Sequence, residues 1–89
     1  MLTRFGVISF AHAHINAYLS TIRSLDDAVA VAGWDDDRER GEKACREHRL
    51  HFEPDLDTLL ARDDIDAVFV TSQTNRHADH VVAAASAGK

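Results

Sequence analysis

The sequence predicts an α/β domain with an open parallel sheet and helices on both of its faces. Short apolar runs alternate with helical patterns four times along the 89 residues. Such alternation is typical of parallel strands joined by right-handed crossover helices. The second apolar run, over 28–34, shows no polar alternation, which indicates a strand covered on both faces. We expect about four strands in the order 3-2-1-4.

The first strand leads directly into the first helix. Residues 4–9 predict the strand, and a helix is expected over 11–24. The helix carries apolar side chains at helical spacing: Ile15, Leu19 and Ile22, with Tyr18 and Leu25 widening the same face. The turn places a helix N-terminus at the carboxyl end of a parallel strand. Free N–H groups and the helix dipole favour an anion there.

The second strand, over 28–34, ends at three consecutive acids: Asp35, Asp36 and Asp37. Acids suit the start of a helix, because carboxylates accept hydrogen bonds from its free N–H groups. This second helix is expected to reach about residue 48, with Ala44 and Cys45 among its few apolar anchors. A short third strand is expected over 50–52.

The last third of the chain predicts a helix, a strand and a helix. The first helix is expected over 56–61 with Asp55 as its N-cap. Its apolar face consists of Leu56, Leu59 and Leu60. Residues 65–71 predict the fourth strand, and the last helix is expected over 75–87 with Gly88 as its C-cap. The expected apolar face of that helix consists of Ala78, Val81, Val82 and Ala85.

The composition excludes several classes of protein. The formal net charge is −5 and no basic stripe interleaved with aromatic residues is present, so no nucleic-acid partner is expected. No apolar run is long enough to span a membrane, and no export signal begins the sequence. Cys45 is the single cysteine, which favours the reducing cytoplasm, and its thiol is expected to be buried rather than nucleophilic.

The turn after the first strand stands where a dinucleotide-binding fingerprint would lie. That fingerprint, G-x-G-x-x-G, joins a strand to a helix. Here the window runs from Ser9 to His14 and has none of the three glycines. Ser9 and Ala11 are small enough for the backbone to approach a pyrophosphate, whereas bulky His14 requires a different helix–strand packing. The window alone does not establish a nucleotide site.

Asp35 matches the second part of the fingerprint. It lies 21 positions after His14 and ends the predicted second strand, where a carboxylate can accept hydrogen bonds from an adenosine ribose. The neighbouring acids would repel a phosphate on that ribose, which favours NAD over NADP, although Arg38 and Arg40 lie nearby. The alternative is that the acids only cap the second helix.

A third polar cluster, over 71–77, follows the fourth strand. In an open α/β sheet the ligand crevice lies outside the carboxyl ends of the strands, here beside the first strand. The hydroxyl and amide groups of this cluster could hydrogen-bond a cofactor there. Thr74 or Asn75 could also cap the last helix, and both roles can hold together.

Four segments of the chain carry a family resemblance. They are Phe-Gly-Val-Ile, Val-Ala-Gly-Trp-Asp-Asp-Asp-Arg-Glu-Arg, Ile-Asp-Ala-Val-Phe-Val-Thr-Ser, and Asn-Arg-His with the Ala-rich helix ending Ala-Gly-Lys. Their order and spacing over 4–89 resemble the N-terminal part of the NAD(P)-binding Rossmann domain of the Gfo/Idh/MocA oxidoreductases. The resemblance implies hydride transfer between a nicotinamide cofactor and a sugar- or polyol-like alcohol or carbonyl.

The resemblance also implies roles for individual residues. The turn that would hold the pyrophosphate consists of Ser9, Phe10, Ala11 and His12. Asp35 would bind the adenosine ribose, and the nicotinamide side would be lined by Ser72, Thr74, Asn75 and His77. NAD is the expected cofactor, with NADP second. Residues 1–89 are then expected to be a truncated domain without the substrate domain, inactive alone and oligomeric as part of the complete protein.

Two alternatives stay open. His12 and His14 directly after a strand, with His77 and His80 at i, i+3 spacing, would suit a metal-dependent hydrolase. The missing glycines would suit a nucleotide-binding module without catalytic activity, because fold alone does not define function.

Overall fold

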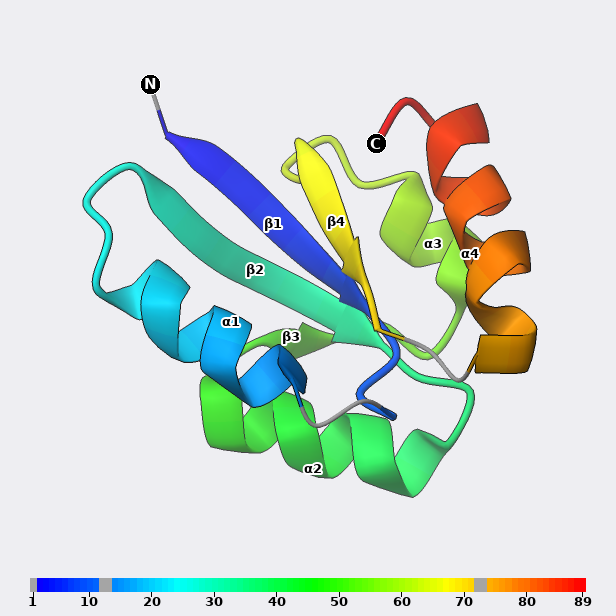
Figure 1. Cartoon of the computed structure of the whole chain (residues 1–89), viewed down its shortest axis with the longest axis horizontal. Coiled ribbons are helices and arrows are strands. Elements are labelled where there is room, and N and C mark those ends of the chain that lie inside the picture. The colour runs from blue at the N-terminus through cyan, green and yellow to red at the C-terminus, as the bar shows by residue number, and fades with distance from the viewer. Residues whose placement is uncertain (1, 12–13, 72–73) are drawn as a thin grey trace.

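The computed structural model describes residues 2–11, 14–71 and 74–89, and of residues 74–78 it describes the backbone alone (Figure 1). Strands and helices alternate along it: β1 Thr3–Ile8, α1 His14–Arg23, β2 Ala28–Trp34, α2 Arg38–His48, β3 His51–Phe52, α3 Leu56–Leu60, β4 Ala67–Val70 and α4 Thr74–Ser86. These bounds agree with the predicted elements to within about three residues wherever the chain is described. None of the helices in the described ranges is long and apolar enough to cross a membrane.

The sheet is parallel and its strand order is β3-β2-β1-β4, which confirms the predicted order. β1 lies in the middle, where Phe5 pairs with Ala30 of β2 and with Ala67 of β4. The register of β1 against β2 shifts by one residue between Phe5 and Gly6. In this strand order β2 and β3 follow on one side of β1, whereas β4 lies on its other side. Open α/β sheets bind ligands in the crevice at such a switch point in the strand order.

Each face of the sheet is covered by its own pair of helices (Figure 1). One core lies under α1 and α2 and consists of Val7, Phe10, Ile15, Leu19 and Cys45. The other lies under α3 and α4 and consists of Ile8, Ala32, Leu59, Leu60, Ile65 and Ala84. Val7 and Ile8 are adjacent in β1 and point to opposite faces, so the central strand contributes to both cores. The predicted Rossmann-like arrangement, with helices on both faces, is confirmed.

Two side chains expected on the buried face of α1 are exposed instead. Tyr18 is 43% exposed and Leu25, which lies beyond the end of α1, is 47% exposed. The Tyr18 ring stacks on Phe69 with ring centroids 5.4 Å apart, and Phe69 stacks on Phe5 at 4.9 Å. The buried stripe of α1 is therefore the narrower one, made by the side chains at i, i+4 and i+7.

The prediction for the buried face of α4 is wrong. Three of its expected members are exposed: Val81, Val82 and Ala85. His80 and Ala84 are buried in their place, and the His80 ring meets Trp34 edge-on with centroids 5.4 Å apart. In an Ala-rich helix the apolar pattern has little contrast, so periodicity does not identify the buried stripe, and a histidine would not be assigned to it.

The helix caps agree with the sequence analysis in part. Asp37 is the N-cap of α2, and its carboxylate accepts a hydrogen bond from the Arg40 N–H at 3.2 Å. Asp55 holds the N-cap position of α3, but its carboxylate accepts from the Thr58 hydroxyl at 3.1 Å rather than from the helix backbone. Gly88 follows α4 in the left-handed region, with φ +78°, as expected of a C-cap glycine.

A series of side-chain hydrogen bonds joins α1 and α2 on one face of the sheet. Arg23 Nη2 lies 2.9 Å from His48 Nδ1, and His48 Nε2 lies 2.9 Å from the side-chain oxygen of Asn16. A neutral imidazole satisfies both contacts, since Nδ1 accepts from the guanidinium while Nε2–H donates to the amide oxygen. Burial and the charge of Arg23 hold the pKa of His48 below its ordinary value, against the opposing effect of Glu47.

This lowered pKa predicts that mild acid destabilises the fold. Unfolded His48 takes up a proton near pH 6.5, whereas folded His48 stays neutral to a lower pH, so protonation favours unfolding between these two values. Urea unfolding from pH 7 down to pH 5.5 should show a smaller loss of stability in His48→Gln than in the wild type. The matched control is His51→Gln on β3. Equal pH dependence in all three proteins would contradict the prediction.

Candidate functional site

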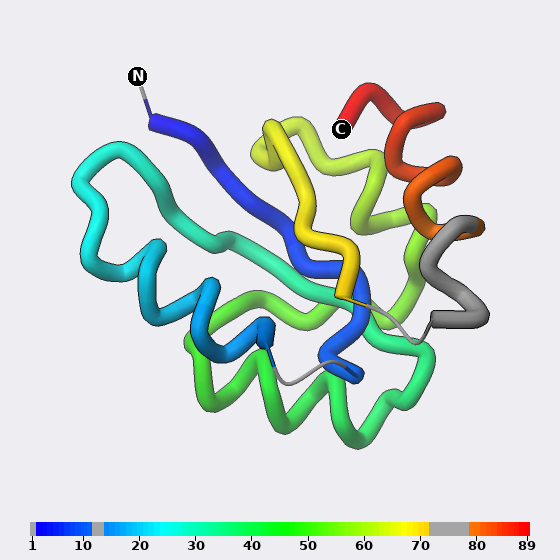
Figure 2. The backbone as a smooth tube through the Cα atoms, viewed as in Figure 1, coloured from blue at the N-terminus to red at the C-terminus, as the bar shows by residue number. Residues whose placement is uncertain are grey.

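The carboxyl ends of β1, β2 and β4 meet at one edge of the sheet (Figure 2). Short hydrogen bonds hold these ends together. The Ser9 N–H donates to the Trp34 carbonyl at 2.7 Å, which fixes the end of β1 to the end of β2. The Thr71 N–H donates to the Ile8 carbonyl at 3.0 Å, and the Thr71 hydroxyl donates to the Ser9 carbonyl at 2.6 Å. The turn after β1 is therefore tied to both neighbouring strands.

Ser9 adopts a backbone conformation that glycine usually supplies. Its φ is +71°, in the left-handed region, and it stands in the position of the first fingerprint glycine. Its hydroxyl oxygen accepts from the Ala11 N–H at 3.2 Å, which closes the turn locally. The chain makes the same sharp exit from the strand as a glycine turn, and the side chain that replaces glycine is one that bonds back to the turn.

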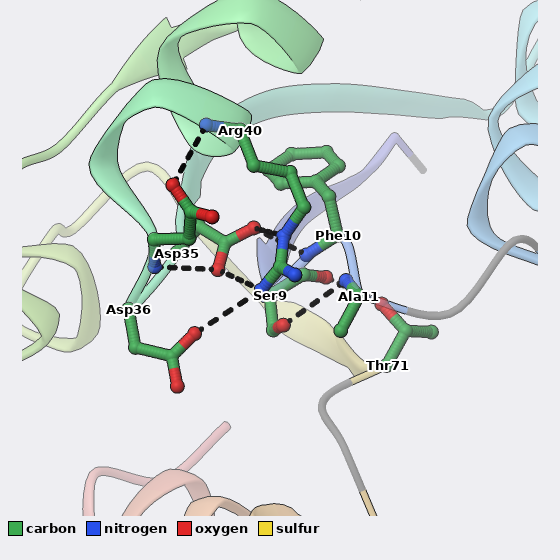
Figure 3. Close-up of polar contacts among 8 residues, drawn as sticks. Ser9, Phe10, Ala11, Asp35, Asp36, Arg40 and Thr71 are labelled. Atoms are coloured by element: carbon green, nitrogen blue, oxygen red, sulfur yellow. Dashed lines mark hydrogen bonds and ion pairs between the residues drawn. The ribbon is translucent and has the colours of Figure 1, made fainter.

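Asp35 connects this turn to the beginning of α2 (Figure 3). Its carboxylate accepts from the Phe10 N–H at 3.0 Å and from the Asp37 N–H at 3.0 Å. The Arg40 guanidinium binds both carboxylate oxygens, with Nε and Nη2 each at 2.7 Å. Four donors thus converge on one fully buried side chain, from the turn after β1, from the residues after β2 and from α2.

The ion pair is charged on both sides. Burial alone would raise the pKa of Asp35, but the hydrogen bonds from Arg40, Asp37 and Phe10 outweigh it and hold that pKa below its ordinary value. Its hydrogen bond with Asp35 raises the pKa of Arg40. Asp36 adds a second carboxylate, because its Oδ1 accepts from Arg40 Nη2 at 3.2 Å. The edge of the sheet therefore presents one cation among three consecutive acids.

Two glycines allow the elements around Asp35 to come close. A Cβ on Gly33 of β2 would lie 2.7 Å from the ring of Phe10, and a Cβ on Gly41 of α2 would lie 2.7 Å from Asp35 Cβ and from Phe52. Both distances are shorter than real contacts. In the fingerprint, the third glycine allows the first helix to pack closely on the strand. In this chain Gly41 allows a close approach of the second helix, α2, beside Asp35. His14, in the third fingerprint position, is exposed at the start of α1.

The structure brings together only part of the expected site. Ser9, Phe10, Ala11 and Asp35 lie at one edge of the sheet, joined by the hydrogen bonds above. His12 and Ser72 lie outside the described residues. Thr74, Asn75 and His77 belong to the first turn of α4, and their side chains also lie outside the description. Their expected roles stay predictions.

Sequence reasoning missed Gly41, and it did not foresee the contacts of two residues that it had noted, Arg40 near Asp35 and Thr71 in the polar cluster over 71–77. Arg40 attracted attention only as a nearby charge, yet it binds Asp35 in a bidentate manner. A glycine one turn into a charged helix is a sequence signal for close backbone approach, and Gly41 could have been identified in this way. No sequence signal marks Thr71 as the partner of the Ser9 carbonyl.

The alternative chemistries find little support in the described part of the chain. No three His, Cys, Asp or Glu side chains in that part are grouped so that they could hold a metal ion, and His12 of the metal hypothesis lies outside it. Cys45 is buried as predicted, and burial raises the pKa of its thiol to about 12, so it is protonated at neutral pH. It is a core side chain rather than a nucleophile.

A model of the family GFO_IDH_MocA, described as an oxidoreductase family with an NAD-binding Rossmann fold, matches residues 4–89. The chain is 31% identical over 85 residues to 4-carboxy-2-hydroxymuconate-6-semialdehyde dehydrogenase of Sphingobium sp. strain NBRC 103272 / SYK-6. That match covers 94% of this chain and 26% of the dehydrogenase, so the chain spans about a quarter of its relative's length.

Solved structures give the same match. A myo-inositol dehydrogenase from Lactobacillus casei, in complex with NAD(H) and myo-inositol, is 36% identical with a TM-score of 0.81, over 94% of this chain and 25% of that one. A 3-ketoreductase from Actinomadura kijaniata, in complex with NADP and TDP-benzene, is 26% identical with a TM-score of 0.87, over 100% and 27%. These findings favour the oxidoreductase interpretation over the hydrolase.

The left-handed conformation of Ser9 predicts an unusual order of stability. Ser9→Ala removes the hydroxyl but keeps the Cβ strain, whereas Ser9→Gly removes both. The left-handed region disfavours a residue with a Cβ by about 1–2 kcal/mol, so we expect Ser9→Gly to be about 1 kcal/mol more stable than Ser9→Ala in urea unfolding. An Ala variant as stable as the Gly variant would contradict this strain.

The close approach of α2 predicts that Gly41→Ala destabilises the fold by about 1–3 kcal/mol, because the new Cβ overlaps Asp35 and Phe52. In an exposed helix the same change would stabilise by about 1 kcal/mol. The matched control is the exposed Lys43 of the same helix, where Lys43→Ala should be more stable than Lys43→Gly. Urea unfolding measures the three variants and the wild type, and a stabilised Gly41→Ala would contradict the close approach.

Proposed function

Because the chain belongs to the Gfo/Idh/MocA oxidoreductase family, which has an NAD-binding Rossmann fold, we propose that its carboxyl sheet edge binds a nicotinamide dinucleotide for hydride transfer. The observation that carries the proposal is the junction of the Ser9 turn with Asp35, where a fingerprint turn and its acidic residue meet without any fingerprint glycine. In the complete protein the hydride acceptor or donor would be a sugar- or polyol-like alcohol or carbonyl. A myo-inositol dehydrogenase among the relatives supports this substrate class.

The pyrophosphate would lie against the beginning of α1. The N–H groups of Ser9 and Phe10 are used inside the protein, so these residues shape the turn rather than donate to a phosphate. The Ala11 N–H makes only a 3.2 Å bond to the Ser9 hydroxyl, and the first N–H groups of α1 have no helical acceptors. Helix N-termini of this kind bind phosphates through these groups and the helix dipole. Ala11, and His12 beside it, would face the cofactor.

The adenosine ribose would lie beside Asp35, whose carboxylate is the acceptor that this position requires. The acids Asp36 and Asp37 would disfavour a phosphate on the ribose, so NAD is the proposed cofactor and NADP the weaker one. Relatives of both kinds exist, since the two solved structures above hold NAD(H) and NADP.

The nicotinamide would extend toward the beginning of α4, along Ser72, Thr74, Asn75 and His77. When bound, the nicotinamide supplies or accepts the hydride, and the residues of this chain would bind and orient it. The proton of the substrate hydroxyl would be handled elsewhere in the complete protein. We propose that the complete protein is a cytoplasmic dehydrogenase. It would assemble into oligomers and have no nucleic-acid or membrane partners.

The proposal predicts saturable binding of NADH that depends on the turn. Ala11→Glu places a carboxylate and extra bulk where the pyrophosphate would lie, so we expect at least tenfold weaker binding, in line with one repulsive charge at a partly exposed site. Isothermal titration calorimetry measures the affinity, and quenching of Trp34, the single tryptophan, gives a second readout.

The matched control is Ala85→Glu, which adds the same side chain to an exposed position near the end of α4. It should bind NADH as the wild type does. Circular dichroism checks that every variant is folded. Failure of the folded wild type to bind either nucleotide, or equal losses in both variants, would overturn the proposed site.

A further inference from the structure

Arg40 stands between Asp35 and solvent. The Asp35 side chain is 0% exposed, whereas the Arg40 side chain that covers it is 32% exposed. Both carboxylate oxygens already accept from the guanidinium, and each also accepts from a backbone N–H. A ribose hydroxyl that approaches Asp35 would therefore meet Arg40 first (Figure 3).

The guanidinium also has donors directed away from Asp35. Its Nε and Nη2 bind Asp35, and Nη2 reaches Asp36 as well. For Nη1 the described residues provide no acceptor. An arginine with free N–H groups beside an adenosine ribose is suited to a 2′-phosphate, because planar guanidinium groups bind phosphates well. In nucleotide sites of this kind an acid binds the ribose hydroxyls of NAD, whereas an arginine binds the 2′-phosphate of NADP. Here the two residues of these types, Asp35 and Arg40, bind each other.

We propose that Arg40 is the residue that determines cofactor preference at this edge of the sheet, an inference that rests on the proposed nucleotide-binding function. Arg40 holds the Asp35 carboxylate away from the ribose hydroxyls and offsets the repulsion that the three acids exert on a 2′-phosphate. Its presence narrows the difference in affinity between NAD and NADP. Asp36 acts in the opposite direction, because it binds Nη2 and adds negative charge beside it.

A role of Arg40 in cofactor preference and a purely structural role predict different changes in nucleotide affinity. Loss of a supporting contact would deform the turn and weaken both nucleotides together. If Arg40 sets the cofactor preference, loss of its guanidinium would leave Asp35 accessible to ribose hydroxyls and would remove the cation near a 2′-phosphate. NADH would then bind more tightly and NADPH more weakly. The ratio of the two dissociation constants separates these cases.

The experiment measures the dissociation constants of NADH and NADPH by calorimetry for the wild type and three variants. Arg40→Gln should raise the ratio of the NADPH to the NADH dissociation constant by about tenfold, the size expected from one charge at a partly exposed site. Asp36→Asn should lower the ratio. Arg38→Gln is the matched control: it removes the same charge from the same helix, but Arg38 binds Glu42 instead of Asp35. Its ratio should stay within about twofold of the wild type, because exposed charges are screened.

Several results would overturn the inference. Equal changes of the ratio in Arg40→Gln and Arg38→Gln would indicate a general charge effect. A loss of affinity for both nucleotides at constant ratio in Arg40→Gln would indicate a structural role only. If Arg40→Gln does not fold, an unchanged ratio in Asp36→Asn would suffice. A wild type that binds neither nucleotide overturns the proposed function as well, whereas a wild type that binds both with a ratio unaffected by Arg40→Gln overturns this inference alone.

Discussion

The buried carboxylate of Asp35 is the contact on which the site depends. It accepts four hydrogen bonds, from the turn after β1, from the first residues after β2 and from α2. A buried charge without such partners would be strongly unfavourable, so the chain must bring these segments together whenever it folds. One side chain at the end of β2 thereby defines where the turn after β1 lies and where α2 begins.

Small residues make this junction possible. Gly41 lets the backbone of α2 approach Asp35, and Gly33 leaves room for the ring of Phe10, the residue whose backbone N–H donates to Asp35. Ser9 turns the chain in a left-handed conformation and bonds back to the Ala11 N–H. The roles of the fingerprint glycines are thus divided between Ser9, in the first fingerprint position, and two glycines outside the fingerprint, so the tight turn forms without any fingerprint glycine.

The sheet order and the elements could be predicted from the sequence because they depend on the alternation of apolar runs with helical patterns and on chain connectivity. β2 is an example, with its bounds predicted as observed, since an unbroken apolar run ends at three acids. The buried stripe of α4 could not be predicted, because alanines give no contrast and His80 replaces an apolar side chain. In the site, Asp35 could be identified from its spacing, but its partner could not: whether Arg38 or Arg40 reaches it depends on the direction in which α2 leaves the strand, which tertiary packing decides.

The bond between Asp35 and Arg40 also bears on how a nucleotide could enter this site. Removing one partner of a buried ion pair typically costs about 3–5 kcal/mol, but the net contribution of an intact pair is often near zero, because desolvation offsets attraction. Arg40 is partly exposed, so its guanidinium can return to water at a smaller penalty than a buried one. A ribose that replaces the guanidinium at Asp35 would exchange charge-assisted hydrogen bonds for weaker ones, so the displacement of Arg40 lowers the affinity for the ribose. The pair can therefore hold the turn after β1 and α2 in place and still give way to a ligand, at a cost in the affinity for that ligand.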